Sequence, residues 1–329
     1  MKNVQVRLRR RPQGMPSVED FEIVESELAE PGEGELVVAH SYIELQPAVR
    51  LRMGTDYEPT MPLGSVPLGQ AVGQVLRSRN TEFPEGTHVV VNGGWQSHSI
   101  SNGEKVSALE TDAVPITYHL GCLGSSGMTA YVGVNDLVRL QPGQTIVISA
   151  ATGAVGSVAG QLARLKGCRV VGVAGGQAKC AFAVEEYGYS ACVDHYADDF
   201  AERLAAACPD GVDVDFENVG GIVRDNVWSL MNNFGQVLVC GLISEYNRPD
   251  LVAGPGWKSA LERSLTIRGF RLRDHMHRRD AFLEEATDLV ARGLLKTRED
   301  ITVGLTNLPE AFINMLKGGN FGKTIVQVT

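Results

Sequence analysis

Apolar residues change their spacing near residue 120 of this 329-residue chain. Before that point they fall in short runs separated by Gly, Pro and Asn, as in EPGEG at 30–34 and NGG at 92–94. These runs have the length of β-strands and cover 5–9, 22–27, 35–43, 72–77 and 88–91. Few helical patterns lie between them, so the first part is predicted to be a mostly antiparallel β barrel or sandwich.

From about residue 120 onward, short apolar runs alternate with helical stretches. The runs are rich in Val and Ile and cover 145–149, 169–174, 191–193, 212–217, 236–240 and 265–270. The helical stretches cover 156–166, 179–187, 198–207 and 223–232. This alternation is typical of a parallel sheet covered on both faces, and it predicts a doubly wound α/β nucleotide-binding fold. A final helix and strand, at 309–317 and 323–328, either close this sheet or return to the first domain.

A phosphate-binding loop is predicted where the strand TIVIS at 145–149 leads into a helix. Gly153 allows the backbone to approach a pyrophosphate, and Gly156 lets the helix pack closely on the strand. The helix N-terminus adds a favourable dipole. Ala151 stands where the dinucleotide fingerprint has its first glycine. The predicted loop contacts are Ala151, Thr152, Gly153, Ala154, Val155 and Gly156.

The segment after the next strand favours NADP(H) over NAD(H). An NAD-preferring site usually has Asp or Glu about 20 residues after the loop, to bind the ribose 2′-hydroxyl. Here AGGQAK at 174–179 has no carboxylate. Gly175 leaves room for a 2′-phosphate and Lys179 supplies a cation, although Lys179 in an exposed first helical turn is the alternative. His195, after the third strand, is a further candidate contact to the 2′-phosphate or the adenine.

The charge balance argues against a nucleic-acid partner, because 30 basic residues face 39 acidic ones and the formal net charge is −9. No apolar run approaches the ~18–20 residues that a membrane span requires. The arginines near the N-terminus precede no apolar stretch, so no signal peptide is expected and a cytoplasmic protein is predicted. The six cysteines contain no CxxC and the seven histidines no HExxH, so no metal site is expected.

Several motifs of the second half resemble the zinc-independent medium-chain dehydrogenase/reductases. They are AATGAVGSVAGQLARLKGCRVVGVAGGQAKC, DFENVGG, VCGLISEYN and GGNFGKTIV. The most similar subgroup comprises the leukotriene B4 12-hydroxydehydrogenase/prostaglandin reductases, the alkenal double-bond reductases and the bacterial curcumin reductases. The resemblance is strong over about 120–329 and loose before that.

This resemblance implies a GroES-like catalytic domain at 1–118, an NADP-binding Rossmann domain at 119–300, and a segment at 301–329 that returns to the catalytic domain. It also implies cofactor contacts in the matching motifs, where Lys179 corresponds to the lysine that binds the 2′-phosphate. Tyr246 corresponds to the tyrosine near the nicotinamide. The other implied cofactor contacts are Cys240, Asn218 and Asn320. Relatives usually form homodimers by pairing sheet edges, and SLTIRGF at 264–270 is the candidate edge strand.

The first domain departs from the family pattern at one position of the substrate site. Relatives commonly read VDPYMR where this chain reads LQPAVR, so Ala48 replaces the family's tyrosine. Tyr57 lies near another aromatic position of that pocket. A larger pocket with one hydroxyl fewer is therefore expected, which leaves the substrate open.

The function implied by the resemblance is NADPH-dependent reduction of the carbon–carbon double bond of an α,β-unsaturated aldehyde or ketone. Tyr246 is the main candidate for a catalytic donor and Tyr57 the weaker one. A zinc-independent NADPH quinone reductase is the alternative enzyme, although the Tyr246 motif favours the first activity. A cofactor-binding structural or sensor protein without turnover is a third hypothesis.

Overall fold

The computed structural model describes residues 1–54, 59–110, 114–248, 250 and 252–329. Its contacts divide the chain into two units. Unit 1 comprises Met1–Gly121 and Glu299–Thr329, and unit 2 comprises Cys122–Arg298. Unit 1 is thus built from two stretches of chain that the whole of unit 2 separates in sequence.

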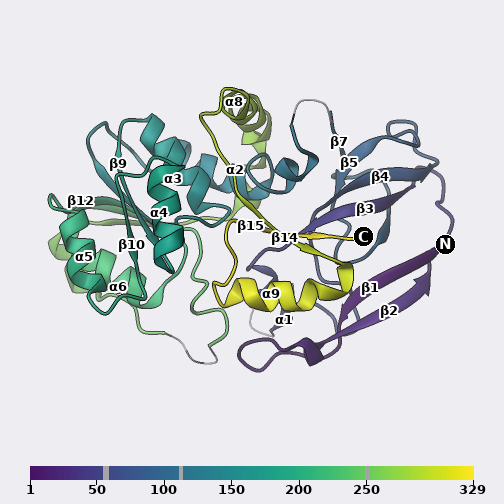
Figure 1. Cartoon of the computed structure of the whole chain (residues 1–329), viewed down its shortest axis with the longest axis horizontal. Coiled ribbons are helices and arrows are strands. Elements are labelled where there is room, and N and C mark those ends of the chain that lie inside the picture. Colours follow the sequence, from purple (N-terminus) through teal and green to yellow (C-terminus); the bar gives the residue numbers. More distant parts are fainter. Residues whose placement is uncertain (55–58, 111–113, 249, 251) are drawn as a thin grey trace. The chain divides into compact units, whose positions relative to one another are not determined.

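Unit 1 is rich in strands (Figure 1). Its elements are β1 (Lys2–Leu8), β2 (Phe21–Glu27), β3 (Leu36–Glu44), α1 (Val49–Met53), β4 (Ala71–Ser78), β5 (His88–Val91), β6 (His98–Ser101), β7 (Ser107–Ala108), β14 (Glu299–Val303), α9 (Leu308–Leu316) and β15 (Lys323–Gln327). Short 3₁₀ turns lie at Val18–Asp20, Ile116–Leu120 and Leu305–Asn307. The main sheet has the order β14-β15-β3-β4-β5-β7, β6 pairs with β3, and β1 and β2 form a separate antiparallel pair.

The C-terminal strand β15 lies inside the main sheet of unit 1, between β14 and β3. The buried Lys323 on β15 donates to the buried carboxylate of Glu44 on β3 over 2.7 Å. An aromatic cluster adds to the core, because Trp95 packs against both Phe21 and Phe312. The core of unit 1 therefore joins the beginning and the end of the described chain.

Unit 2 is an α/β sandwich (Figure 1). Its parallel sheet has the order β10-β9-β8-β11-β12-β13. Its elements are α2 (Ser125–Val132), a π-helical turn (Gly133–Leu137), β8 (Thr145–Ser149), α3 (Gly156–Leu165), β9 (Arg169–Ala174), α4 (Gln177–Glu185), β10 (Ala191–Asp194), α5 (Phe200–Ala207), β11 (Val212–Glu217), α6 (Gly221–Ser229), β12 (Met231–Val239), α7 (Trp257–Glu262), β13 (Thr266–Gly269), a 3₁₀ segment (Leu272–Arg278) and α8 (Arg279–Ala291).

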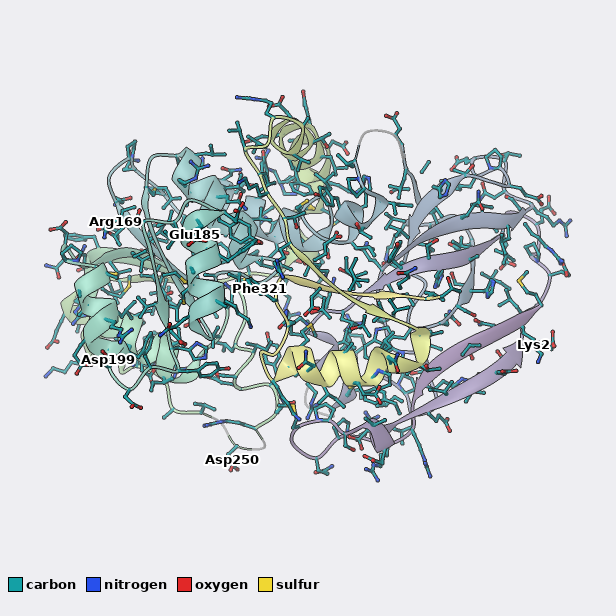
Figure 2. All side chains as sticks on the ribbon, in the orientation of Figure 1. Lys2, Arg169, Glu185, Asp199, Asp250 and Phe321 are labelled. Carbon is teal, nitrogen blue, oxygen red and sulfur yellow. The ribbon has the colours of Figure 1, made fainter. Side chains whose placement is uncertain are left out.

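Both faces of this sheet are covered, which explains the continuous apolar runs of its strands. On one face, Phe200 and Leu204 of α5 pack with Val147 and Val171 in a buried apolar cluster to which α6 also contributes. On the other face, Gly133 lies against the ring of Phe216. The charged side chains of Glu185 on α4 and of Asp199, just before α5, are exposed (Figure 2).

The predicted helix at 223–232 is wrong at its end. Helix α6 stops at Ser229, and β12 already begins at Met231. The first part of β12 is polar and irregular, since Phe234 has a φ of 63° and the pairing with β11 shifts its register between Val212 and Val214. A polar, bulged strand lacks the apolar signature from which strands are predicted.

None of the helices within the described ranges combines the length and the apolar character needed to cross a bilayer.

Candidate functional site

The predicted phosphate loop is a tight connection between β8 and α3. Ala150 follows β8 with a φ of 51°, and its carbonyl accepts the Gly153 N–H over 2.8 Å. A Cβ atom at Gly156 would lie 2.3 Å from the Ala150 oxygen, so only glycine fits where the helix starts. The Tyr189 hydroxyl holds the helix start by donating to the Gly156 carbonyl over 2.7 Å.

The predicted loop residues divide into buried and half-buried positions. Ala151, Thr152 and Gly156 are buried, and the side chains of Ala151 and Thr152 support the loop from within. The half-buried positions are Gly153, Ala154 and Val155. The backbone of these three residues, at the N-terminus of α3, is where a pyrophosphate would bind.

The turn after β9 brings together the residues predicted to bind the 2′-phosphate. A Cβ atom at Gly175 would lie 3.0 Å from Cε1 of His195 and 2.7 Å from the ring of Tyr196. The His195 Nδ1–H donates to the Ala174 carbonyl over 2.9 Å, which fixes the imidazole beside the turn. Lys179 is half-buried in the first turn of α4. Both aromatic rings therefore lie against Gly175, and Lys179 follows it by four residues in the chain.

Asp194 at the end of β10 is a residue of this turn that the sequence analysis missed. Its Oδ1 accepts the N–H groups of Gly176 and Tyr196 over 2.8 and 3.0 Å. Burial raises the pKa of Asp194, but these backbone donors outweigh it and hold the pKa below its usual range. This carboxylate therefore stabilises the turn itself. The aspartate of VDHY at 193–196, at the end of the third strand, is the signal that could have revealed it.

A second group of predicted residues lies at the carboxyl ends of β8 and β11. The Asn218 N–H donates to Ser149 Oγ over 2.7 Å, and Asn218 Nδ2 donates to the Ser149 carbonyl over 2.8 Å. Ser149 Oγ in turn donates to Glu217 Oε1, which also accepts the Gly220 N–H. The buried Glu217 therefore orients Asn218 through Ser149.

Tyr246 joins this group from the segment after β12. Its phenol oxygen accepts the Leu242 N–H over 3.3 Å. A Cβ atom at Gly241 would lie 3.2 Å from that oxygen and 3.3 Å from the Asn218 carbonyl. Burial and the neighbouring Glu217 raise the pKa of the Cys240 thiol to about 12, so this thiol stays protonated. The structure thus places Tyr246, Asn218 and Cys240 at one edge of the sheet, where doubly wound folds bind their cofactors.

The structure does not bring the remaining predicted residues into these two groups. Asn320 belongs to unit 1, where its amide donates to the Gly322 carbonyl over 2.9 Å. Tyr57 lies outside the described residues. Ala48 is exposed just before α1 in unit 1.

Comparison with known proteins identifies the family. Residues 4–109 match the N-terminal domain of oxidoreductase, and residues 154–292 match the family described as zinc-binding dehydrogenase. The chain is 42% identical to NADPH-dependent curcumin reductase of Escherichia coli (strain K12), over 97% of this chain and 94% of that protein. The chain belongs to the zinc-independent medium-chain dehydrogenase/reductases. The family predicted from the motifs is therefore confirmed.

Other members of this family are similar in sequence to this chain over nearly its full length. Prostaglandin reductase 1 of Bos taurus is 38% identical and 2-alkenal reductase (NADP(+)-dependent) of Nicotiana tabacum is 33% identical, each over at least 95% of both chains. The crystal structure of CurA in complex with NADPH from Vibrio vulnificus has 40% sequence identity and a TM-score of 0.95, and covers 99% of both chains. A quinone oxidoreductase of Pseudomonas syringae, 22% identical with a TM-score of 0.80, shares the fold.

The predicted fold class, a GroES-like domain with a Rossmann domain, is confirmed by these matches. Within the ranges that the structure describes, no three His, Cys, Asp or Glu side chains are grouped as metal ligands.

Proposed function

We propose that this protein uses NADPH to reduce the carbon–carbon double bond of an α,β-unsaturated aldehyde or ketone. It is an NADP-dependent oxidoreductase, and the observation that carries the proposal is its relationship to the curcumin, prostaglandin and 2-alkenal reductases along nearly the whole chain. The Tyr246 segment at the sheet edge supports the same activity.

The residues of unit 2 fit NADPH. The half-buried backbone of Gly153 and Val155 would hold the pyrophosphate at the start of α3. Gly175 and Lys179 would take the 2′-phosphate, because Asp194, the carboxylate of this turn, is occupied by backbone donors. NADPH supplies a hydride to the β-carbon of the substrate when it is bound.

The role of the protein is to stabilise the charge that then collects on the substrate's carbonyl oxygen. Conjugation spreads this charge as an enolate, so a well-placed hydrogen-bond donor suffices where an isolated carbonyl would need stronger polarisation. We assign this donor to the Tyr246 hydroxyl, whose oxygen is positioned by the Leu242 N–H. Tyr57 is the second candidate donor.

We propose that the part of the substrate site next to Ala48 accepts substituents of different sizes. A tyrosine at this position, as relatives commonly have, would fill space and offer a hydroxyl, whereas the exposed alanine does neither. Enones with bulky substituents are therefore expected to be accepted.

The test is an NADPH-oxidation screen of the purified protein over enals, enones, quinones and acyl thioesters, with a chelator present. We expect enones or enals to give the highest kcat/KM, and mass spectrometry to find the product saturated at the Cα–Cβ bond. Turnover of quinones alone would assign the protein to the quinone reductases instead. NADPH binding without turnover of any compound would instead support a cofactor-binding protein without enzymatic activity.

A further inference from the structure

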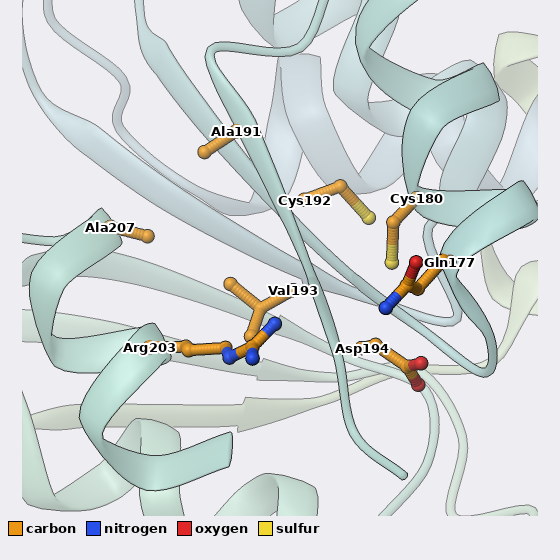
Figure 3. Close-up of a pocket in the computed structure, with 8 residues that line it drawn as sticks. All are labelled: Gln177, Cys180, Ala191, Cys192, Val193, Asp194, Arg203 and Ala207. Carbon is orange, nitrogen blue, oxygen red and sulfur yellow. The ribbon is translucent and has the colours of Figure 1, made fainter. Parts of the chain in front are cut away.

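Two cysteine side chains meet beside the turn that carries Lys179. Cys180 lies in the first turn of α4 and Cys192 lies on β10, and their sulfur atoms face each other (Figure 3). The two thiols are hydrogen-bonded to each other. Gly172 on the adjacent strand β9 leaves room for this contact, because a Cβ atom there would lie 2.9 Å from Cys192 Sγ.

The pair lines a cavity of about 300 Å³ around the edge strand β10 (Figure 3). Helices α4 and α5 supply the rest of the wall, which includes Gln177 and Arg203. Cys192 is half-buried and Cys180 is buried, and both residues line the cavity. By contrast, Cys208 is buried on α5's side of the sheet within the apolar cluster.

The environment makes the two thiols unequal. The hydrogen bond from Cys192 lowers the pKa of Cys180, and burial and the charge of Asp194 oppose this effect. The Ala174 backbone and the charge of Lys179 assist it, so that the pKa lies below its usual value. The same hydrogen bond and burial raise the pKa of Cys192. A thiolate attacks oxidants and a thiol does not, so Cys180 is the side chain that reacts first. A second thiol within contact is what converts such a product into a disulfide.

We propose that Cys180 and Cys192 form a reversible disulfide with hydroperoxides, and that this disulfide weakens the binding of NADPH. The Cys180 thiolate attacks one peroxide oxygen, so an S–O bond forms, the O–O bond breaks, and the other oxygen leaves as water or alcohol after protonation. Cys192 then attacks the sulfenic sulfur, so the S–S bond forms and water leaves. The two thiols lose two electrons and the peroxide gains them.

The link to the cofactor comes from the neighbours of the two cysteines along the chain. Lys179 directly precedes Cys180, and Asp194 follows Cys192 by two residues and accepts the Gly176 N–H. A disulfide fixes its sulfur atoms about 2.05 Å apart, well inside the separation of two hydrogen-bonded thiols. Oxidation therefore pulls the start of α4 and the end of β10 together across the Gly175–Gly176 turn. This second part of the inference rests on the proposed function.

The experiment compares reduced full-length protein with protein treated with hydrogen peroxide and then freed of it. Peptide mapping without reduction is expected to find a Cys180–Cys192 disulfide that dithiothreitol reverses. Fluorescence titration is expected to give an NADPH Kd raised about tenfold in the oxidised form, as for a weakened phosphate contact, with NADH affinity little changed. Cys180→Ser and Cys192→Ser should each abolish the response to peroxide, while Cys208→Ser should keep it.

Two outcomes would overturn the inference. One is sulfinic acid on Cys180, or intact thiols, in place of the disulfide. The other is a disulfide-bonded protein whose Kd for NADPH equals that of the reduced protein. Failure of the proposed function is recognised separately, because reduced protein would then oxidise no NADPH with enals or enones, whatever peptide mapping finds.

Discussion

Lys179 is the side chain on which the proposed preference for NADPH depends. It lies half-buried in the first turn of α4, and the preceding strand β9 contributes no carboxylate to the turn at Gly175. A charge-assisted contact to phosphate is worth roughly 1.5–3 kcal/mol, or on the order of 10–150-fold in affinity. We predict that Lys179→Ala raises the Kd for NADPH within this range and hardly changes that for NADH.

Titration with both cofactors measures this effect. Lys166→Ala, which removes an exposed lysine after α3, is the matched control and should leave both affinities unchanged. An equal loss for NADPH and NADH would reject the assignment of Lys179 to the 2′-phosphate.

Tyr246 is expected to act on the reaction and not on cofactor affinity. Removing one donor to a developing oxyanion typically costs roughly 3 kcal/mol, about 100-fold in rate, and water or the ribose can replace part of it. We predict that Tyr246→Phe lowers the turnover of an enone at least about tenfold and leaves the NADPH Kd nearly intact. The measurement is single-turnover kinetics at saturating cofactor.

Tyr187→Phe provides the comparison, since it removes a buried hydroxyl of unit 2 that has no assigned role in the reaction. Its turnover should equal that of the unchanged protein. If Tyr246→Phe behaves in the same way, the donor is another group, with Tyr57 as the next to be tested.

At the scale of single elements, β11 contains a buried carboxyl group that the fold does not use. Asp215 is in register with Val147 and Val237, which belong to the apolar cluster below α5 and α6, and neither of its oxygens has a hydrogen-bond partner among the described residues. Burial first, and the charge of Glu217 second, raise the pKa of Asp215 well above its usual range. The group is therefore protonated in the folded protein.

This burial predicts a pH dependence of stability. An unfolded aspartate titrates near ~3.9, so above that pH the folded protein holds a proton that the unfolded chain has lost. The contribution of Asp215 to the free energy of unfolding accordingly falls as the pH rises from there toward the raised pKa. We predict that Asp215→Val stabilises the protein by about 1–3 kcal/mol at neutral pH and weakens this dependence.

Denaturant unfolding at about pH 5 and about pH 8 tests this prediction. Asp213→Val is the control on the same strand, because Asp213 accepts the Thr145 N–H and the Asn232 amide and its loss should destabilise the protein. A loss of stability in Asp215→Val at both pH values would contradict the prediction.

The strands and helices of the two units show how much of the fold can be predicted from the sequence. The strand at Thr145–Ser149 was predicted at its observed bounds, because all five residues are buried and apolar runs of that length indicate a doubly covered strand. The partly exposed strand β14 and the short helix α2 are not predicted, since neither has a clear apolar period. The role of Asp194 is not predicted, because it depends on a hydrogen bond to Gly176, 18 residues away along the chain. The spacing of neighbouring residues in the sequence does not reveal such a contact.

At the scale of the whole molecule, unit 2 has an edge that suggests self-association. Strand β13 ends the parallel sheet, and all its residues are exposed. Trp257 and Leu261, one turn apart on the preceding helix α7, are about four-fifths exposed. A free edge beside large apolar side chains is a typical pairing surface. We predict a homodimer that forms through β13 and α7.

Light scattering coupled to gel filtration measures the mass. Leu261→Arg should convert the dimer to a monomer, whereas Val303→Arg, at an exposed apolar position on β14, should not. A monomer before any substitution, or dimers in both variants, would exclude this surface.

The position of β15 within the sheet of unit 1 also affects how the protein folds during its synthesis. A ribosome completes residues 122–298 before it synthesises β15, which pairs with β3. Unit 2 can therefore fold on the nascent chain while unit 1 is still incomplete. During that interval the part of β3 from Tyr42 to Glu44 lacks its partner strand and the Glu44 carboxylate lacks Lys323. Residues 1–121 are thus translated before unit 2 but become native after it, and translation stalled near residue 320 should yield a folded cofactor unit attached to an aggregation-prone one.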